Sequence, residues 1–316
     1  IIGSATAQIA VMSRAMVPAM HEEGYDRGFA AATTAAGGLL APVIPPSMMF
    51  VIFGVLAQVP IGEMFIAGIL PGLLLVLAFA AVITLIGWSQ HFPKGDWMSA
   101  AQIRGAVLAA LPALLVPLAI IGGILFGIAT PTESAAVASL IAFLVGWLVY
   151  RDLDPRKLGE MFVRTAANAS MILFMIAAAS VFGWVIIYEE LPQRLAALIT
   201  SITSDPFVFL LIVNLALLVV GMVIDGIAAI ILITPILLPI ATGSYDISPY
   251  HFGVVACLNL VLGLLTPPVG IGLYIAASMG GTTPGAILRA LWPFLIAVAL
   301  VLVLPTYAPV LSTAPL

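Results

Sequence analysis

One acidic residue, Asp225, lies inside a long apolar stretch, in the sequence GMVIDGIAAI. If that stretch lies within a bilayer, a carboxylate there costs roughly 2.5–3.5 kcal/mol on insertion scales, so it is expected to have a partner. Two partners suit it chemically: a cation, or the free N–H groups of a helix that begins at Gly226. The alternative interpretation is a solvated acid in a loop between two separate helices.

Two other stretches interrupt apolar runs in the same way. Residues 38–42 read Gly-Leu-Leu-Ala-Pro and residues 263–267 read Gly-Leu-Leu-Thr-Pro, and more prolines follow each of them. Proline lacks an N–H and clashes with the preceding turn, so each stretch predicts a broken helix with free carbonyl oxygens. Such oxygens suit Na⁺, and the helix N-termini beyond a break suit an anion. Proline kinks that serve only packing are the alternative, but polar neighbours favour a site: Thr33, Thr34, Ser47, Asn259 and Thr266.

The composition decides which elements can hold these residues. Hydrophobic residues make up 63% of the 316 residues and charged residues only 8%, with a mean hydropathy of +1.25. Soluble domains carry about 25% charged residues, so a water-soluble globular protein is excluded. Runs such as residues 64–88 are apolar on every helical face, whereas a β-barrel strand would alternate. The sequence therefore predicts an all-α polytopic membrane protein, with the single cysteine, Cys257, as a small core residue.

Short polar segments divide the chain into apolar segments of membrane-spanning length, roughly 20 residues each. The segment 206–242 is too long for one crossing and is interrupted at Asp225. It therefore predicts a re-entrant hairpin that returns to the side where it began. With the basic loop 151–164 in the cytoplasm, eight of the ten Lys and Arg residues fall on the cytoplasmic side, as the positive-inside rule requires.

Three landmarks recur in the same order at nearly constant spacing, which indicates a duplicated unit. They are Pro18 and Pro239, 221 apart; Gly38–Pro42 and Gly263–Pro267, 225 apart; and Pro71 and Pro293, 222 apart. The first copy spans about residues 1–90 and the second about 206–316. Five predicted crossings separate the equivalent loops 21–27 and 243–250, so these loops are expected on opposite faces. The repeats are then inverted, as in many secondary transporters.

The repeat assigns a role to the first residues of the sequence. By the same alignment, residues 1–20 correspond to the second arm of the later hairpin, and the first arm of their own hairpin is expected to precede residue 1. Ser4 then takes the place of Asp225 at the first hairpin tip, and Thr6 follows it. Ser4 is predicted to contribute to the site, with a simple helix N-cap as the alternative.

Other polar residues have structural interpretations. Glu133 follows Pro131-Thr132 at a helix start, where an acid favours the dipole and closes a capping pattern. Arg14 is expected to snorkel or to pair with a carboxylate, with substrate binding as the alternative. Asn168 and Asn214 are expected to bond between helices.

No pattern in the sequence supports an enzyme. It contains no phosphate-binding loop, GxSxG or HExxH motif, and its three histidines lack metal-ligand spacing. An intramembrane enzyme would need a second acid, or a nucleophile and base, at the depth of Asp225. A channel would more naturally show parallel repeats around a pore loop. A transport protein is therefore expected rather than either of these.

Three stretches resemble the large membrane subunit of the tripartite ATP-independent periplasmic (TRAP) transporters. They are GGLLAPVIPPSMMFVIFGVLAQVPIGEMFIAGILPGLLL, FGIATPTESAAVASLIAFLVGWLVYRDL, and GMVIDGIAAIILITPILLPIA followed by HFGVVACLNLVLGLLTPPVGIGL. The resemblance covers essentially all of residues 1–316. The family's subunit is longer, so its first part is expected to lie before residue 1.

The resemblance implies a Na⁺-driven elevator that imports organic anions, often carboxylates such as sialic acid or dicarboxylates, across the bacterial inner membrane. It implies two protein partners: a periplasmic substrate-binding protein, which delivers the anion, and a small four-helix membrane subunit. The protein is expected to lie in the lipid bilayer and to bind no nucleic acid. A divalent-anion/Na⁺ symporter of similar fold that needs no binding protein is the alternative.

The resemblance also implies which residues form the site. One Na⁺ site would lie between the first hairpin tip and the first broken helix, at Ser4, Gly38 and Pro42. A second would lie between the second tip and the second broken helix, at Asp225, Gly263, Thr266 and Pro267. Substrate would lie between the tips, near Ser4, Thr6, Pro45, Ser47 and Thr266. The first tip reads GSATA, whereas the family commonly has a second serine directly after the first.

The chain is expected to divide into moving and static parts. The predicted parts are a first transport half at 1–63, scaffold and connecting helices at 64–205, a second transport half at 206–286, and a C-terminal scaffold helix at 287–316.

Overall fold

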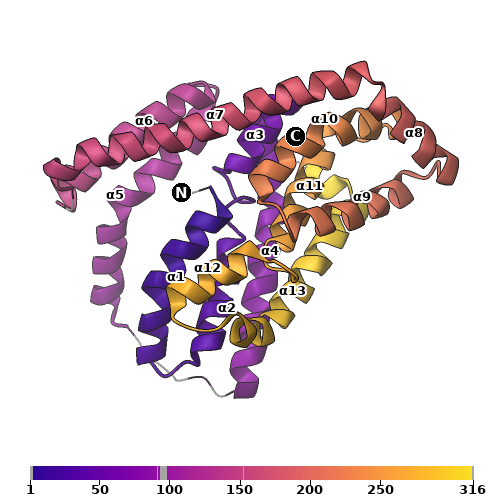
Figure 1. Cartoon of the computed structure of the whole chain (residues 1–316). Coiled ribbons are helices and arrows are strands. Elements are labelled where there is room, and N and C mark those ends of the chain that lie inside the picture. The colour runs from indigo at the N-terminus through magenta and orange to yellow at the C-terminus, as the bar shows by residue number, and fades with distance from the viewer. Residues whose placement is uncertain (1–2, 91, 93–97, 152, 315–316) are drawn as a thin grey trace. The chain divides into compact units, whose positions relative to one another are not determined.

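The computed structural model describes residues 3–90, 92, 98–151 and 153–314, and most of this part of the chain is helical (Figure 1). The α-helices are α1 (Ala5–Glu22), α2 (Arg27–Gly38), α3 (Met48–Ala57), α4 (Ile61–Gln90), α5 (Ala100–Leu125), α6 (Pro131–Leu144), α7 (Leu158–Tyr188), α8 (Leu191–Ile202), α9 (Pro206–Gly221), α10 (Gly226–Tyr245), α11 (Pro249–Gly263), α12 (Ile271–Gly280), α13 (Pro284–Tyr307) and α14 (Val310–Thr313). A π-helical turn, η1 (Val145–Val149), and a 3-10 turn, η2 (Pro155–Lys157), flank the connection between α6 and α7.

Long apolar helices establish the class of fold. Six helical segments of the described chain are long and apolar enough to cross a membrane: Ile61–Ser89, Ala100–Leu125, Pro131–Val149, Pro155–Tyr188, Gly226–Tyr245 and Pro284–Tyr307. Between residues 3 and 314, the described part contains no strand. The prediction of an all-α polytopic membrane protein is confirmed.

The chain forms two compact units. One is Lys94–Ala178, and the other combines Ile2–Pro93 with Ala179–Leu316, so the boundary falls inside α7. The larger unit contains both predicted hairpin tips and both predicted breaks. It also contains α4 and α13, and the division into transport and scaffold helices remains a prediction.

Within the larger unit, the two copies of the repeat pack against each other reciprocally. The helices α1, α2, α3 and α4 of the first copy correspond in order to α10, α11, α12 and α13 of the second. Corresponding helices begin 221 to 223 residues apart. In the first copy α1 packs against α12 of the second, and in the second copy α10 packs against α3 of the first (Figure 1). Likewise α2 packs against α13, and α11 packs against α4. This exchange of partners is what an approximate two-fold axis between the repeats produces.

The two ends of α4 show that the repeats are inverted. Just beyond its C-terminal end, the ring of Phe92 packs edge-on against Tyr25, with centroids 5.1 Å apart. At its N-terminal end, the Tyr250 hydroxyl donates a hydrogen bond to Glu63. Because α4 has 30 residues, it is about 45 Å long. The equivalent loops that carry Tyr25 and precede Tyr250 therefore lie at opposite ends of the unit, as predicted.

The segment 206–242 forms the predicted hairpin. Phe209, near the start of α9, stacks on Tyr245, at the end of α10, with ring centroids 4.3 Å apart. The Tyr245 hydroxyl also donates to the carbonyl of Thr203, just before α9, at 2.9 Å. The chain therefore returns to the level where it entered, and the tip at 222–225 lies at the far end of both arms.

Polar side chains join three helices near the second break. The Asn259 amide nitrogen donates to both the main-chain and side-chain oxygens of Asn214, at 2.8 Å each. Asn214 in turn donates to the Thr306 hydroxyl at 3.1 Å. These bonds link α11, α9 and α13, which confirms the prediction for Asn214. Asn168 is exposed, and its predicted bond between helices remains a prediction.

Two other structural predictions are confirmed. Cys257 is fully buried in α11. In the smaller unit, Thr130 and Glu133 form a capping box at the start of α6: the Glu133 carboxylate accepts from the Thr130 N–H at 2.8 Å, and the Thr130 hydroxyl accepts from the Glu133 N–H at 3.3 Å. Glu133 therefore has the structural role expected from the sequence.

Candidate ion and substrate site

The start of α1, which is the predicted first hairpin tip, is fixed to the end of the first break through Gly3. The Gly3 carbonyl accepts a hydrogen bond from the Met48 N–H at 3.2 Å. Gly3 has a φ of +64°, and an added Cβ would lie 3.1 Å from the Pro46 carbonyl oxygen, so glycine suits this position on both counts. Ser4 occupies the N-cap position of α1, but its hydroxyl bonds to the Thr6 hydroxyl at 3.1 Å instead of capping the helix.

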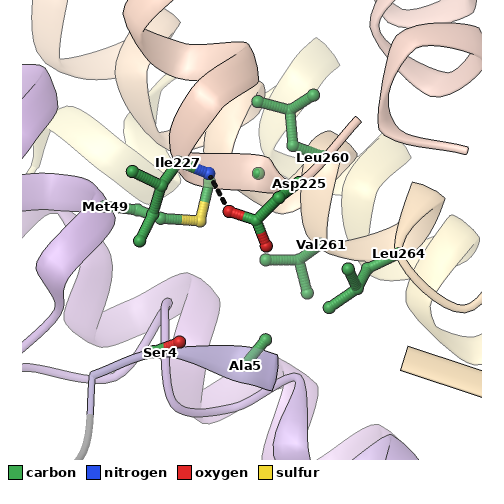
Figure 2. A pocket seen from close by; sticks show the side chains of 9 residues that line it. Ser4, Ala5, Met49, Asp225, Ile227, Leu260, Val261 and Leu264 are labelled. Atoms are coloured by element: carbon green, nitrogen blue, oxygen red, sulfur yellow. Dashed lines mark hydrogen bonds between the residues drawn. The ribbon is translucent and has the colours of Figure 1, made fainter. Parts of the chain in front are cut away.

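The second hairpin tip carries the half-buried carboxylate of Asp225. One carboxylate oxygen accepts from the Ile227 N–H at 3.0 Å, which confirms that Asp225 caps α10. The other oxygen points into the space between Asp225 and the chain at Ser4 and Ala5 (Figure 2). Capping therefore uses one oxygen and leaves the second directed toward the other tip.

Close main-chain contacts fix the second tip to the second break. The Met222 carbonyl accepts from the Gly270 N–H at 3.2 Å. Gly263 packs directly on Gly221, because an added Cβ would lie only 2.6 Å from the Gly221 carbonyl carbon. Both hairpin tips thus bond to the residues that end the neighbouring break.

Both predicted breaks are present. Helix α2 ends at Gly38 and α3 begins at Met48, whereas α11 ends at Gly263 and α12 begins at Ile271. Each break contains a cis Pro-Pro bond, Pro45-Pro46 in the first and Pro267-Pro268 in the second. These pairs lie 222 residues apart, in step with the flanking helices, whereas the Gly-Leu-Leu motifs lie 225 apart. The first break therefore has three extra residues between its glycine and its proline pair.

Of the break carbonyls that the sequence suggested as Na⁺ ligands, some are free and others already accept hydrogen bonds. Among the described residues, no donor bonds to the carbonyls of Thr266 and Pro267. The Gly38 carbonyl already accepts from Ala41 and the Gly263 carbonyl from Thr266, at 3.3 and 2.9 Å. The Pro42 carbonyl accepts from the Ser47 hydroxyl. Each carbonyl oxygen has two lone pairs, so these three can still bind a cation with the second.

A small pocket lies where the two tips meet. It is lined by Ser4, Ala5, Met49, Asp225, Gly226, Ile227, Leu260, Val261 and Leu264 (Figure 2). Its volume is about 20 Å³, enough for roughly one water molecule or one ion. Helices α1 and α10 both begin at this pocket, so two positive helix ends border it beside one carboxylate.

The structure brings some predicted site residues together and separates others. Ser4 and Asp225, predicted from opposite halves of the chain, line the same pocket, and Thr6 bonds to Ser4 beside it. The predicted break residues do not line it: Gly38, Pro42, Pro45, Ser47, Gly263, Thr266 and Pro267.

Several of the break residues are engaged elsewhere. Ser47 is buried and caps α3 by accepting from the Phe50 N–H at 3.2 Å. The Thr266 hydroxyl donates to the Leu262 carbonyl at 2.7 Å, and its own carbonyl has no donor among the described residues. Gly38 packs against α1, because an added Cβ would lie 2.3 Å from the Ile9 side chain.

The apolar wall of the pocket was not predicted from the sequence. Leu260, Val261 and Leu264 lie in and just after the last turn of α11, and Met49 lies in the first turn of α3. Each is within four residues of a predicted site residue, either Gly263 or Ser47. Apart from this closeness in sequence, no signal in the chain distinguishes them from other apolar residues.

Inverted repeats, a helical hairpin and broken helices grouped around one pocket are typical of secondary transporters. The chain also matches the DctM component of the tripartite ATP-independent periplasmic transporters over residues 1–311. It therefore belongs to this family of transporter permeases, which are not enzymes, and it is a multi-pass membrane protein.

Individual relatives agree over nearly the whole chain. The large permease protein of a sialic acid TRAP transporter from Vibrio cholerae is 37% identical over 309 residues, covering 96% of this chain and 72% of the relative. The large permease protein of a C4-dicarboxylate TRAP transporter from Pseudomonas aeruginosa is 34% identical over 312 residues, covering 99% and 73%. An isethionate TRAP transporter permease protein, DctMQ, from Oleidesulfovibrio alaskensis is 36% identical over 316 residues; this chain spans about half (49%) of that relative's length.

Proposed function

We propose that this chain is part of a Na⁺-driven secondary transporter that imports small organic anions across the bacterial inner membrane by an elevator movement. A periplasmic substrate-binding protein delivers the anion, and a small four-helix membrane subunit joins the permease. The three relatives are named as transporters of sialic acid, C4-dicarboxylates and isethionate, all of which are organic acids, and this supports an organic anion as the substrate.

The observation that carries the proposal is the meeting of the two hairpin tips at one pocket. Ser4 and Asp225 occupy equivalent places in the two repeats and line the same space. A carboxylate oxygen that points into this space suits a cation, and the starts of α1 and α10 suit an anion. One location therefore offers ligands of both signs, as coupled binding of Na⁺ and an organic anion requires.

The proposed Na⁺ ligands combine each tip residue at the pocket with carbonyls of the neighbouring break, which lie outside the pocket lining. At the second tip they are Asp225 with the free carbonyls of Thr266 and Pro267 and the second lone pair of Gly263. At the first tip they are Ser4 with Gly38 and Pro42. Substrate would contact Ser4, Thr6, Pro45, Ser47 and Thr266 when the space between the tips widens. The present pocket of about 20 Å³ is too small for an organic acid, so substrate binding requires that widening.

A symporter that needs no binding protein is the alternative, because its fold would place two hairpins and two breaks in the same way. Uptake by proteoliposomes separates the two functions. The permease, with its small subunit, is reconstituted and supplied with a candidate organic acid, with or without a Na⁺ gradient and with or without the periplasmic binding protein. The proposal expects uptake only when both are present. Uptake that needs the Na⁺ gradient but no binding protein would support the alternative, and uptake that needs neither would contradict both.

A further inference from the structure

A groove in the smaller compact unit lies at the end of α6 and has no role in the proposed transport site. It is lined by Trp147, Leu148, Arg151, Leu153 and Pro155 and has a volume of about 400 Å³. Sites for small ligands usually measure about 300–1,000 Å³. The groove is therefore large enough to hold the head group of a lipid.

The groove is held open by contacts on several sides. The side chain of Leu153 fits against Gly146, where an added Cβ would lie 3.2 Å from it. The indole of Trp147 packs edge-on against Phe143, with ring centroids 5.2 Å apart. The Tyr150 hydroxyl donates to the Ala109 carbonyl at 2.8 Å, which ties this turn to α5. Contacts from α5, α6 and the turn after α6 therefore border the groove.

The groove combines a cation with exposed apolar side chains. Leu148 is 65% exposed and Trp147 is 47% exposed, and both belong to the last turn of a span-length helix. Arg151 follows directly; among the described residues, which do not include its neighbour Asp152, no carboxylate forms an ion pair with it. The nearby Asp154 carboxylate accepts from the Arg156 N–H. An apolar wall that ends in a guanidinium matches a molecule with an acyl chain and an anionic head group.

The position along the chain favours a lipid over a soluble anion. The positive-inside rule places the loop 151–164 at the cytoplasmic face, where anionic lipids attract basic residues. Tryptophan is enriched at this level of membrane proteins, where its ring lies between head groups and acyl chains. Arginine binds phosphate oxygens through two parallel N–H bonds, which lysine cannot do.

We propose that this groove binds the phosphate of an anionic phospholipid of the cytoplasmic leaflet. Arg151 donates to the phosphate oxygens, Trp147 lies beside the glycerol, and Leu148 contacts the first methylene groups of an acyl chain. The groove is expected to favour phosphatidylglycerol over phosphatidylcholine because phosphatidylglycerol has a net negative charge, whereas the choline ammonium offsets the charge of the phosphate in phosphatidylcholine.

Lipid titration of the purified, delipidated permease tests the proposal. Phosphatidylglycerol with brominated acyl chains is added in detergent, and the quenching of tryptophan fluorescence is measured, with Trp147→Phe identifying the part due to Trp147. We expect Arg151→Gln to weaken this binding about tenfold or more, since tenfold is the lower end of what a hydrogen bond to a charged group contributes. Arg164→Gln is the matched control, because Arg164 is exposed and paired with Glu160 at 2.7 Å, outside the groove.

Any one of four results would overturn the proposal. The first is equal binding of phosphatidylglycerol by Arg151→Gln and Arg164→Gln. The second is equal quenching by brominated phosphatidylcholine, and the third is displacement of the lipid by an equal concentration of glycerol 3-phosphate, which would indicate a soluble phosphate instead. If Arg151→Gln does not fold, Arg151→Lys replaces it, with weaker binding expected because lysine lacks the planar fork. Displacement of the lipid by the small membrane subunit would show that the groove is a protein interface and would also overturn the proposal.

Discussion

At the scale of single residues, substitution can separate the capping role of Asp225 from its proposed role as a Na⁺ ligand. One oxygen caps α10 and the other points into the pocket between the tips. Asparagine caps helices as well as aspartate does, but it carries no charge, whereas alanine does neither. We expect Asp225→Asn to fold normally and to need about tenfold more Na⁺ for half-maximal uptake, because it loses a charged ligand. Asp225→Ala should abolish Na⁺-driven uptake and also lower stability by roughly 0.5–2 kcal/mol.

The matched control for this substitution is Asp205→Asn. Asp205 caps α9 by accepting from the Phe207 and Val208 N–H groups at 2.7 and 3.3 Å, and it is exposed at the far end of the hairpin. Its substitution should leave the Na⁺ dependence of uptake unchanged. Wild-type Na⁺ dependence in Asp225→Asn would exclude Asp225 as a cation ligand.

Residue chemistry in the sequence identified the polar part of the candidate site but not its apolar wall. Asp225 was found because a carboxylate in an apolar run is costly, and Ser4 because it is the repeat equivalent. Met49 and Leu264 carry no such signal, since an apolar residue in an apolar segment is the ordinary case. The sequence also could not predict which break carbonyls are free, because the bond from the Ser47 hydroxyl to the Pro42 carbonyl depends on the local path of the chain.

At the scale of helices, adjacent glycines at the end of α2 have different surroundings. An added Cβ at Gly38 would lie 2.3 Å from the Ile9 side chain and 3.2 Å from the Ile9 nitrogen, whereas at Gly37 it would meet nothing within 4 Å. We expect Gly38→Ala to destabilise the protein by roughly 1–3 kcal/mol through overpacking of α1 against α2. Gly37→Ala is the control and should be neutral or stabilise by up to about 1 kcal/mol. Thermal unfolding in detergent measures both, and equal midpoints for the two variants would show that this contact does not hold the first break.

Both helix breaks could be predicted because proline and glycine impose local constraints that hold in any surroundings. The register between them could not be predicted as well. The Gly-Leu-Leu motifs align at a spacing of 225, but the helices and proline pairs align at 221 to 223. The repeated Gly-Leu-Leu motif marks the glycine that ends the helix before each break. The first break has three extra residues after this glycine, so the motif is offset from the helices and proline pairs.

At the scale of the whole molecule, a count of charges and crossings predicted the inversion that the packing displays. The reciprocal contacts of α1 with α12 and of α10 with α3 require an approximate two-fold relation between the repeats. The order of the landmarks and the charge of the loops could be read from the sequence, but it could not show that both tips reach one pocket. That depends on the contact of Gly221 with Gly263 and of Gly3 with Pro46, where the absence of a side chain permits close approach.

The inversion predicts that two equivalent positions are accessible from opposite faces of the membrane. Glu22 and Ser244 lie 222 residues apart, both are exposed, and each lies in the last turn of its helix, α1 or α10. In a Cys257→Ala background, Glu22→Cys and Ser244→Cys are labelled with a membrane-impermeant maleimide. We expect Ser244→Cys to react in spheroplasts, from the periplasmic side, and Glu22→Cys to react only in inverted vesicles, because α4 separates the two loops by about 45 Å. Labelling of both cysteines from the same face would contradict inverted repeats, and reversed labelling would keep the inversion but reverse the orientation that the basic loops indicate.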